Sequence, residues 1–463
     1  MMRSLYSGVS GLQNHQIRMD VIGNNISNVN TIGFKKGRVN FQDILSQTMS
    51  GAARPTEEVG GINPKQVGLG MNVASIDTLH LQGSLQTTGV ISDVAIQGNG
   101  YFIMRAGDKE FYTRAGSFTV DEGGMLVNPS NGMRVQGWMA ENVDGINVLS
   151  TARDVEDLII PIGSKDPAQE TTQVDLACNL NKNALEVTEG VSSPKDILEN
   201  TWSLDKTIYD AMGIEHTMRI NFSKVVGEQN QWSGEVLVDP LEDQAAINPL
   251  VGVNAEGADN TFTVEFDNNG TIARVFDNQG NELNQGALQM NVTFNLAQAR
   301  EAVPGTPENQ TFTVNLGNVG STVDAVTQFG ESFSTKAFKQ NGFGMGYLET
   351  YQIDNSGIIT GVYSNGNNRT IGQIALASFT NPGGLEKAGE STFVVSNNSG
   401  DANIGTSGVA GKGKIISGSL EMSNVDLAEA FTDMIVTQRG FQANSRTITT
   451  SDQMLQELLT LKR

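Results

Sequence analysis

Apolar side chains recur at every seventh position along the last stretch of the chain, residues 423–461. A seven-residue apolar repeat kept without a break is typical of the contact line between helices of a coiled coil. We expect a helix about 55 Å long here, at about 1.5 Å per residue. A second row, four residues further on, is apolar at its ends but polar at Gln438, Ser445 and Asp452. The unbroken row, the C-terminal seam, comprises Leu427, Met434, Phe441, Ile448 and Leu455.

Both ends of this predicted helix carry suitable polar and charged residues. Ser423, Asn424 and Asp426 offer capping side chains and a negative charge at its start. Lys462 and Arg463 place positive charge at its end. Burial of each seam side chain is worth about 1.5–3 kcal/mol, provided that another surface covers it. The helix therefore requires a partner.

The first stretch of the chain repeats this pattern and predicts a second amphipathic helix over about residues 4–28. Gly8, Gly11 and Gly23 weaken it by roughly 1 kcal/mol each as an isolated helix, so we expect it to form fully only when packed. Two ordinary core helices of one globular domain are the alternative interpretation. Against it, the two seams lie at opposite ends of the chain, with strand-like sequence between them. The N-terminal seam comprises Leu5, Leu12, Met19 and Ile26.

From about Gly70 the apolar positions alternate with period two, which is typical of strands. Residues 101–104, 118–120 and 125–127 are predicted strands. An Asp-x-x-Gly pattern with Asn or Glu in its second position recurs four times between apolar or β-branched residues, and each copy predicts a hairpin turn. A calcium loop is the alternative, but none of the four shows the spaced carboxylates of an EF-hand. The four copies lie at 121–124, 267–270, 277–280 and 354–357.

The predicted fold class is mainly β with long terminal α-helices, in a nested multidomain order. Residues 170–324 hold 7 basic and 23 acidic residues, so they carry 7 − 23 = −16 of the total charge of −21. A separate, solvated β domain is consistent with that charge. The predicted boundaries are 1–30 and 420–463 for a terminal helical, coiled-coil domain, 31–70 for an extended linker rich in Gly, Ser, Gln and Asn, 71–170 and 335–419 for an inner β domain, and 171–334 for an inserted acidic outer β domain.

Composition and charge exclude several classes of function. The net charge of 30 − 51 = −21 argues against nucleic acid and against an anionic membrane surface as partners. A single cysteine excludes an intramolecular disulfide and a Cys-rich zinc site. No apolar run is long enough to span a membrane. The N-terminal residues lack the apolar core and cleavage site of a secretory signal peptide, which by itself favours a cytoplasmic protein.

Enzyme signatures also fail, so we expect no enzymatic activity, no cofactor and no metal site. Residues 408–413, GVAGKG, resemble a phosphate-binding loop. However, Thr406 stands where its first glycine belongs, and Gly413 stands where Ser or Thr is needed. The three histidines, His15, His80 and His216, have no metal-ligand spacing, and packing or solvated roles are expected for them.

The single cysteine, Cys178, alternates with polar or small residues in step with Val174, Leu176 and Leu180. This pattern places it on the apolar face of a strand. One interpretation is an inert buried thiol that packs as a small apolar group. The other is a reactive thiol, in which case the upstream Lys165, in the loop 163–167, becomes relevant. The residues alone leave both interpretations open.

Several longer motifs carry a family resemblance. Residues 24–34 read NNISNVNTIGF, and this segment resembles the N-terminal signature of the rod and hook group of bacterial flagellar axial proteins. The resemblance covers about residues 1–180 and 340–463, whereas little of the middle is recognisable. The matching C-terminal motifs are 421–427, 438–444 and 454–459, and the motifs that resemble the inner β domain of hook proteins are 98–102, 112–118, 363–366 and 372–382.

The resemblance implies a structural subunit of the hook, the curved tube that joins the flagellar motor to the filament. It implies that the terminal helices pair and pack with those of neighbouring subunits into a homopolymer. Its implied partners are the hook cap, the distal rod, the hook-filament junction proteins and the type III flagellar export apparatus. Export without a cleaved signal peptide would explain the missing leader. The implied location is the flagellar hook and basal body, which is periplasmic in a spirochaete.

Residues 160–169 and 175–181 resemble spirochaete hook proteins in particular. In that subgroup neighbouring subunits become joined by lysinoalanine without an added enzyme. Carried over to this chain, Cys178 would lose its sulfur by β-elimination, and the neutral amine of Lys165 from an adjacent subunit would add to the product. Asn179 would support the reaction. The chemistry requires a deprotonated lysine and near-attack geometry.

Two other functions remain as alternatives. A distal rod protein shares both terminal motifs, although the long middle segment disfavours it. A secreted β-rich adhesin or carbohydrate-binding protein would use the acidic domain as its binding surface. Only Trp202 and Trp232 support the adhesin, and it leaves the terminal seams unexplained.

Overall fold

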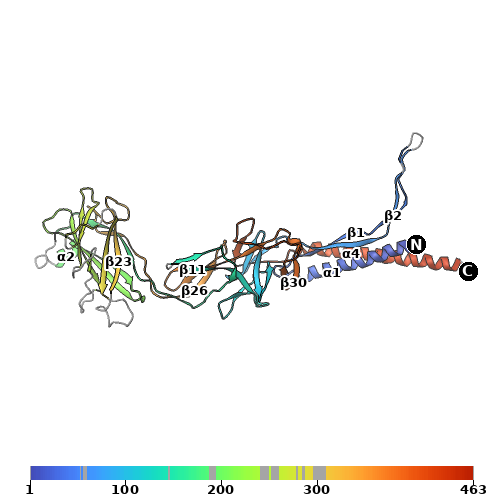
Figure 1. The fold of residues 1–463 in the computed structure, drawn as a ribbon, viewed down its shortest axis with the longest axis horizontal. Coiled ribbons are helices and arrows are strands. Elements are labelled where there is room, and N and C mark those ends of the chain that lie inside the picture. The colour runs from blue at the N-terminus through green and yellow to red at the C-terminus, as the bar shows by residue number, and fades with distance from the viewer. Residues whose placement is uncertain are drawn as a thin grey trace. The chain divides into compact units, whose positions relative to one another are not determined.

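The computed structural model describes residues 2–52, 54–55, 60–143, 146–186, 194–239, 250–251, 260–277, 280–283, 287–295 and 309–461. The chain forms two compact units, and mostly strands lie between its terminal helices (Figure 1). The fold class predicted from the sequence, mainly β with long terminal helices, is confirmed. The helical unit comprises Met1–Ile162, Glu349–Val362 and Asn368–Arg463, and the insert unit comprises Gly163–Leu348 and Tyr363–Asn367. The sequence prediction placed the limits of the insert at 171 and 334.

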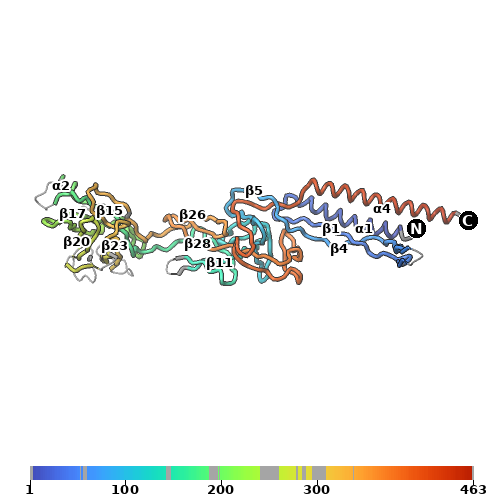
Figure 2. The backbone as a smooth tube through the Cα atoms, turned by 90° about the horizontal axis from the view of Figure 1, so that it is seen from above, coloured from blue at the N-terminus to red at the C-terminus, as the bar shows by residue number. Residues whose placement is uncertain are grey.

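In the helical unit, α1 (Met2–Ser27) and α4 (Leu427–Leu461) pack side by side and antiparallel, with both chain ends at the same end of the pair (Figures 1 and 2). Both helices predicted from the seams are therefore confirmed. Asp426 caps α4, because its Oδ1 accepts a hydrogen bond of 2.7 Å from the backbone N–H of Ala428. Lys462 and Arg463 lie outside the described residues.

Residues 31–70, predicted as an extended linker, instead contain the three strands β1, β2 and β3. β1 pairs with β4 in a two-stranded ribbon that lies beside α1 (Figure 2), and β2 pairs with β3 in a separate two-stranded sheet. Two buried asparagines of α1 satisfy backbone groups of the ribbon. Asn25 donates to Gly37 O and accepts from Gly37 N, and Asn14 donates to Met71 O at 2.6 Å. The paired strands are β1 (Gly37–Asp43) with β4 (Met71–Thr78), and β2 (Ser46–Ser50) with β3 (Lys65–Gly68).

The β part of the helical unit is built around a sheet with the strand order β26-β27-β28-β11-β7-β8-β31-β30. Its core includes Tyr101, Ile103, Tyr112, Trp138 and Phe393. The predicted strands at 101–104, 118–120 and 125–127 overlap β7, β9 and β10. The strands lying wholly or largely in this unit are β5 (Leu85–Thr87), β6 (Val94–Gln97), β7 (Tyr101–Ala106), β8 (Lys109–Thr113), β9 (Thr119–Val120), β10 (Leu126–Val127), β11 (Arg134–Val143), β12 (Ile146–Leu149), β13 (Glu156–Asp157), β26 (Gly346–Ile353), β27 (Ile358–Tyr363), β28 (Asn368–Ile374), β29 (Leu376–Ser378), β30 (Glu386–Gly389), β31 (Thr392–Val394), β32 (Asn403–Gly405), β33 (Lys414–Ser417) and β34 (Ser419–Glu421), with the short helix η1 (Pro382–Gly384).

The insert unit packs two sheets against one apolar core. One sheet has the order β19-β22-β23-β15-β24, with β25 also paired to β15, and the other has the order β16-β17-β18-β20-β21. Burial alternates along most of these strands, as the period-two pattern predicts. The elements are β14 (Lys165–Asp166), β15 (Gln173–Asn181), α2 (Pro194–Asn200), β16 (Trp202–Tyr209), β17 (Glu215–Lys224), β18 (Gln231–Val238), β19 (Leu250–Val251), β20 (Thr261–Phe266), β21 (Ile272–Asp277), β22 (Ala287–Asn295), β23 (Asn309–Asn318), β24 (Thr327–Phe329) and β25 (Ser334–Gln340).

The four Asp-x-x-Gly segments form the predicted turns. In each one the glycine N–H donates to the aspartate carbonyl oxygen at 3.0–3.1 Å, and the glycine has a positive φ of 77–82°. Glycine adopts this left-handed conformation without steric cost. Each aspartate also accepts backbone N–H groups of its own turn with Oδ1. The carboxylates therefore have a structural role in holding the turns.

Candidate functional site

Glycines bring the two terminal helices into close contact. A methyl group added at Gly11 would lie 2.7 Å from Asn444 Nδ2, and one at Gly440 would lie 2.9 Å from the His15 ring. One at Gly8 would lie 3.1 Å from Ile448 Cγ1. Larger residues at these positions would require the Asn444, His15 and Ile448 side chains to shift or the helices to move apart. Gly8 and Gly11, two of the three glycines that weaken α1 as an isolated helix, thus allow it to pack closely against α4.

The buried line along α4 consists of small and polar residues. Ala430, Thr437 and Ser451 are at most 9% exposed, and Asn444, at the same seven-residue spacing, is half-buried. This line lies three positions after the predicted seam. A search for apolar repeats misses it, whereas a search for small residues at sevens would have found it.

The predicted seam is only partly covered within one chain. On α4, Leu427 and Phe441 remain 42% and 38% exposed. The other seam residues are half-buried: Leu5, Leu12, Met19, Ile26, Met434, Ile448 and Leu455.

Further apolar side chains on the two helices face solvent. Ile435 and Val436 are each 58% exposed, Leu459 is 70% exposed, and Tyr6 of α1 is 63% exposed. Phe431, Met454 and Leu458 add to this surface. Phe431 with Ile435, and Met454 with Leu458, are spaced four residues apart and so are neighbours on the surface of α4. Exposed apolar groups of this kind mark an interaction site. The helix pair therefore has unpaired apolar surface available for other partners.

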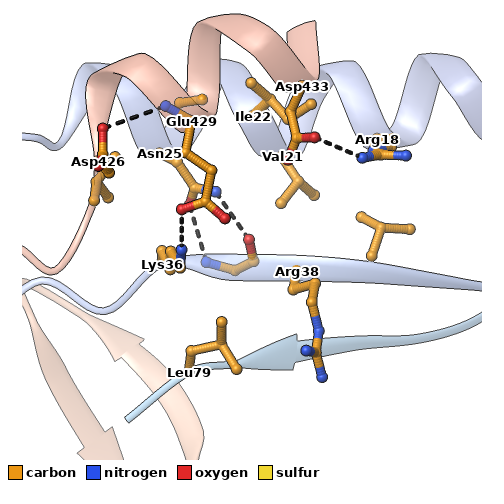
Figure 3. A pocket seen from close by; sticks show the side chains of 14 residues that line it. Arg18, Val21, Ile22, Asn25, Lys36, Arg38, Leu79, Asp426, Glu429 and Asp433 are labelled. Atoms are coloured by element: carbon orange, nitrogen blue, oxygen red, sulfur yellow. Dashed lines mark hydrogen bonds and ion pairs between the residues drawn. The ribbon is translucent and has the colours of Figure 1, made fainter. Parts of the chain in front are cut away.

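Two ion pairs and an amide join α1, α4 and the start of the ribbon around a cavity between α1, β1 and the start of α4 (Figure 3). Lys36 Nζ lies 2.7 Å from Glu429 Oε2, and Arg18 Nη2 lies 3.1 Å from Asp433 Oδ1. Asn25 contacts the ribbon at Gly37 in the same view. The charged partners are partly exposed, so each pair contributes only about 0–1 kcal/mol.

A buried charge cluster joins the first and last parts of the chain. Glu421 accepts from Lys35 Nζ at 2.6 Å and from Arg114 Nη1 at 3.1 Å, and all three side chains are buried. Lys35 also donates to Leu81 O at 2.7 Å. Burial lowers the pKa of Lys35, although the Glu421 carboxylate acts in the opposite direction. Removing one member leaves the others buried and unpaired, so any substitution in this cluster should strongly lower the stability of the helical unit.

The three histidines have packing roles. His15 packs against Gly440 and lies edge-on to Phe41. The Tyr101 hydroxyl lies 2.8 Å from His80 Nδ1, and His216 Nδ1 lies 2.6 Å from Asp239 Oδ2. Across the described ranges, no group of three or more metal-binding side chains is placed to hold a metal ion. Within the same residues, no helix is long and apolar enough to cross a membrane.

Cys178 lies on β15 and points into the core of the insert unit, as its alternation with Val174, Leu176 and Leu180 predicts. Its side chain is 3% exposed, and burial raises the pKa of the thiol to about 12. The pairing of β15 with β25 is irregular between Ala177 and Cys178. In this arrangement the thiol is protonated and covered.

Asn179, the residue after the cysteine, organises the neighbouring segment. Its Oδ1 accepts from Phe329 N at 3.0 Å and lies 3.3 Å from Thr327 Oγ1. Its Nδ2 donates to the carbonyl oxygens of Glu331 and Ser332 at 3.4 Å. One amide therefore holds the connection between β24 and β25.

Lys165 lies on β14 with an exposed side chain, and its backbone pairs with Tyr347 of β26. The next residue, Asp166, is buried, and Asn365 Nδ2 donates to its Oδ2 at 3.3 Å. Lys165 and Cys178 thus belong to different strand pairings of the same unit.

The two tryptophans that supported the adhesin alternative do not form an exposed binding surface. Trp232 is 0% exposed in the core of the insert unit. Trp202 packs against that core and stacks on Phe333, with ring centroids 5.4 Å apart. Both side chains therefore serve packing.

Four sequence families match successive parts of this chain. Residues 5–35 match the family described as Flagella basal body rod protein, and 416–461 match Flagellar basal body rod FlgEFG protein C-terminal. Residues 95–163 match Flagellar hook protein FlgE/F/G D1 domain, and 179–343 match Flagellar basal body protein FlaE D2 domain.

Two relatives match over their whole length. Flagellar hook protein FlgE of Treponema pallidum is 56% identical over 465 residues, and that of Borreliella burgdorferi is 55% identical over 462 residues. Each match covers 100% of this chain and 100% of the relative. The chain belongs to the flagellar hook protein family. It is accordingly a structural subunit of the flagellar hook and basal body, and its relatives in this family are structural proteins, not enzymes.

Hook family membership does not favour the rod alternative, because the full-length matches at 55–56% identity are to hook proteins.

A solved relative shares the fold. The crystal structure of Helicobacter pylori flagellar hook protein FlgE2 has a TM-score of 0.50 at 16% identity, and covers 73% of this chain and 100% of that chain.

Proposed function

We propose that this hook subunit polymerises through its paired terminal helices into the curved tube that links the flagellar motor to the filament. The exposed apolar surface of the helix pair carries this proposal, because a hook subunit must offer surface to its neighbours. In the polymer, neighbouring copies cover Leu427, Phe441 and the half-buried seam. The proposed partners beyond other copies are the hook cap, the distal rod and the hook-filament junction proteins.

Removal of the residues after Asn424 tests the role of the helices. We expect the truncated chain to form no tubes in electron microscopy. A subtler variant, Ile435→Ser with Val436→Ser, keeps the helix and removes two side chains that are each 58% exposed. Gln438→Ser, an exposed polar position on the same helix, is the matched control and should assemble. Tubes from the truncated chain would contradict the proposal.

The proposed route to the hook is export through the type III flagellar apparatus without cleavage, which in a spirochaete leads to the periplasm. Net charge and the apolar pattern give no support for a membrane-inserted form. Mass spectrometry of subunits from assembled hooks should then find an uncleaved N-terminus. A uniformly shortened N-terminus would argue for a processed leader.

The second part of the proposal is a lysinoalanine bond between Cys178 of one subunit and Lys165 of its neighbour, with Asn179 supporting. Elimination removes the Cα hydrogen and the thiol of Cys178 as hydrogen sulfide and leaves dehydroalanine. The neutral Nζ of Lys165 then adds to Cβ, and one N–H hydrogen passes to Cα. No oxidant is needed. The exposed side chain of Lys165 is consistent with this role, whereas the covered thiol requires local opening around β15.

Gel electrophoresis tests the cross-link directly. Assembled protein should give a ladder of multimers that survives boiling in detergent and reductant. Cys178→Ala and Lys165→Arg should each abolish the ladder, and Lys182→Arg, a second lysine of the same unit, should retain it. Mass spectrometry of the joined peptides should show the loss of hydrogen sulfide. A ladder that persists in Cys178→Ala excludes this chemistry.

A further inference from the structure

Exposed apolar side chains lie on the strand paired with Lys165 and on the segments next to it in the insert unit. Lys165 and Tyr347 are register partners on neighbouring strands, so their side chains stand on the same face. Tyr347 is 45% exposed, and Met345, two residues earlier, is 47% exposed. Met212 is 57% exposed and belongs to a turn that packs against this segment, since a methyl group added at Gly213 would lie 3.4 Å from Met345 N. We call Lys165, Met212, Met345 and Tyr347 the lysine patch.

A second exposed feature adjoins Cys178. Residues 329–332, which we call the Asn179 loop, are held to β15 by the side chain of Asn179. The loop carries Phe329, which is 40% exposed, and the exposed carboxylate of Glu331. Phe329 pairs in register with Asn181, three residues beyond Cys178. The loop therefore presents one aromatic ring and one negative charge close to the cysteine strand.

We infer that the lysine patch of one subunit docks on the Asn179 loop of a second copy of this chain. The two surfaces are complementary in chemistry, because each combines exposed apolar groups with a charge of opposite sign, Lys165 against Glu331. Methionine side chains adapt readily to an aromatic partner such as Phe329. This inference rests on the proposed cross-link and adds the surface that would bring its two residues together.

The contact joins unlike surfaces of identical subunits. Such a head-to-tail contact leaves one free patch and one free loop at the ends of every chain of subunits, so it extends without limit unless it closes into a ring. Cross-links made through it would therefore continue beyond dimers. The same geometry gives Asn179 a positioning role, because its amide holds the loop on which the neighbour docks.

An engineered disulfide tests the contact independently of lysinoalanine. The full chain carries Cys178→Ala, Met345→Cys and Phe329→Cys, and is assembled into tubes and then oxidised. We expect disulfide-linked multimers that reductant dissolves. Val226→Cys replaces Met345→Cys in the control, because Val226 is also exposed, at 55%, but lies on the loop between β17 and β18. The control should remain monomeric on the gel.

Two further variants measure the contact in the cross-linking reaction itself. Met212→Ser with Met345→Ser should slow the appearance of the ladder at least about tenfold while tubes still form, since burial of two such side chains is lost. Glu331→Gln should slow it by about threefold, as for an exposed ion pair. Tubes without disulfide multimers, or an unchanged ladder in the methionine variant, would overturn the inference. A ladder that persists in Cys178→Ala would instead overturn the proposed cross-link. The disulfide experiment would then still test the contact, because it does not depend on lysinoalanine.

Discussion

In the insert unit, the two sheets bury their apolar side chains in a shared core, in which Phe222 and Trp232 are 0% exposed. In the terminal helix pair, the buried line consists of Ala430, Thr437 and Ser451, while larger apolar side chains remain at the surface. Both regions have strongly periodic sequences. In the insert unit the periodic apolar side chains are buried within one chain, whereas in the helix pair they are only partly buried.

This difference indicates where each region obtains its stability. The insert unit has the core of an independent domain. The helix pair has close backbone contact through glycines but little apolar burial, and isolated helices owe most of their stability to packing. We therefore expect variants in the insert core to unfold that unit alone, and variants in the helices to affect assembly first.

The largest effect is expected from Trp232→Ala in the insert core. Truncation of a buried aromatic side chain costs about 3–5 kcal/mol. Denaturant unfolding of the insert unit, followed by Trp202 fluorescence, should shift accordingly, while the helices still support tubes. Val226→Ala, at an exposed position, should change stability by less than about 0.5 kcal/mol. Loss of tubes at temperatures where Trp232→Ala is folded would show that the two regions are not independent.

Glu421→Gln should have a comparable effect on the helical unit. It leaves Lys35 and Arg114 buried without their carboxylate, which costs about 3–5 kcal/mol. Glu429→Gln is the matched control. The Glu429 side chain is 60% exposed, so its ion pair with Lys36 should contribute only about 0–1 kcal/mol. Thermal unfolding of the two variants should differ clearly. Equal melting temperatures would refute the expectation that Glu421 contributes more to the stability of the helical unit than Glu429 does.

Gly11→Val tests the close contact of the helices. The added side chain would meet Asn444, and overpacking of this kind costs about 1–3 kcal/mol. Tube formation should weaken, as measured by the critical concentration for assembly. Gly23→Ala is the control, since a methyl group there meets nothing within 4 Å and should stabilise α1 by up to about 1 kcal/mol. Unchanged assembly in Gly11→Val would show that assembly does not depend on this close contact.

The same contrast explains what could be predicted from sequence. Apolar repeats identify both terminal helices, and alternation places Cys178 on the inward face of a strand. The strands within residues 31–70 were not predicted because polar strands among them, such as β2, lack an apolar face. The contact line of Ala430, Thr437 and Ser451 was missed because small polar residues carry no hydrophobic signal.

Long-range partners could not be predicted either. Lys35 is close in sequence to two further basic residues, Lys36 and Arg38, but its carboxylate partner, Glu421, is 386 positions away. No local pattern connects residues at that distance. For the cross-link residues, the sequence places Lys165 and Cys178 on separate segments, and the resemblance to hook proteins alone joins them. What the structure adds is the surface around each one, the lysine patch and the Asn179 loop.

The last expected effect concerns acid pH and the helical unit, to which His80 belongs. Burial, reinforced by Lys35, Arg114 and Lys387, lowers the pKa of His80 from 6.5 to about 4. The unfolded chain therefore binds a proton at this site more readily than the folded chain between about pH 6.5 and 4, so stability falls as the pH falls through this window. Because the ring is partly accessible, we expect a loss of about 2–3 kcal/mol at most. His80→Asn, which keeps an acceptor for the Tyr101 hydroxyl, should flatten the pH dependence of unfolding relative to the unaltered chain. Identical pH profiles for the two proteins would show that His80 is not the titrating group.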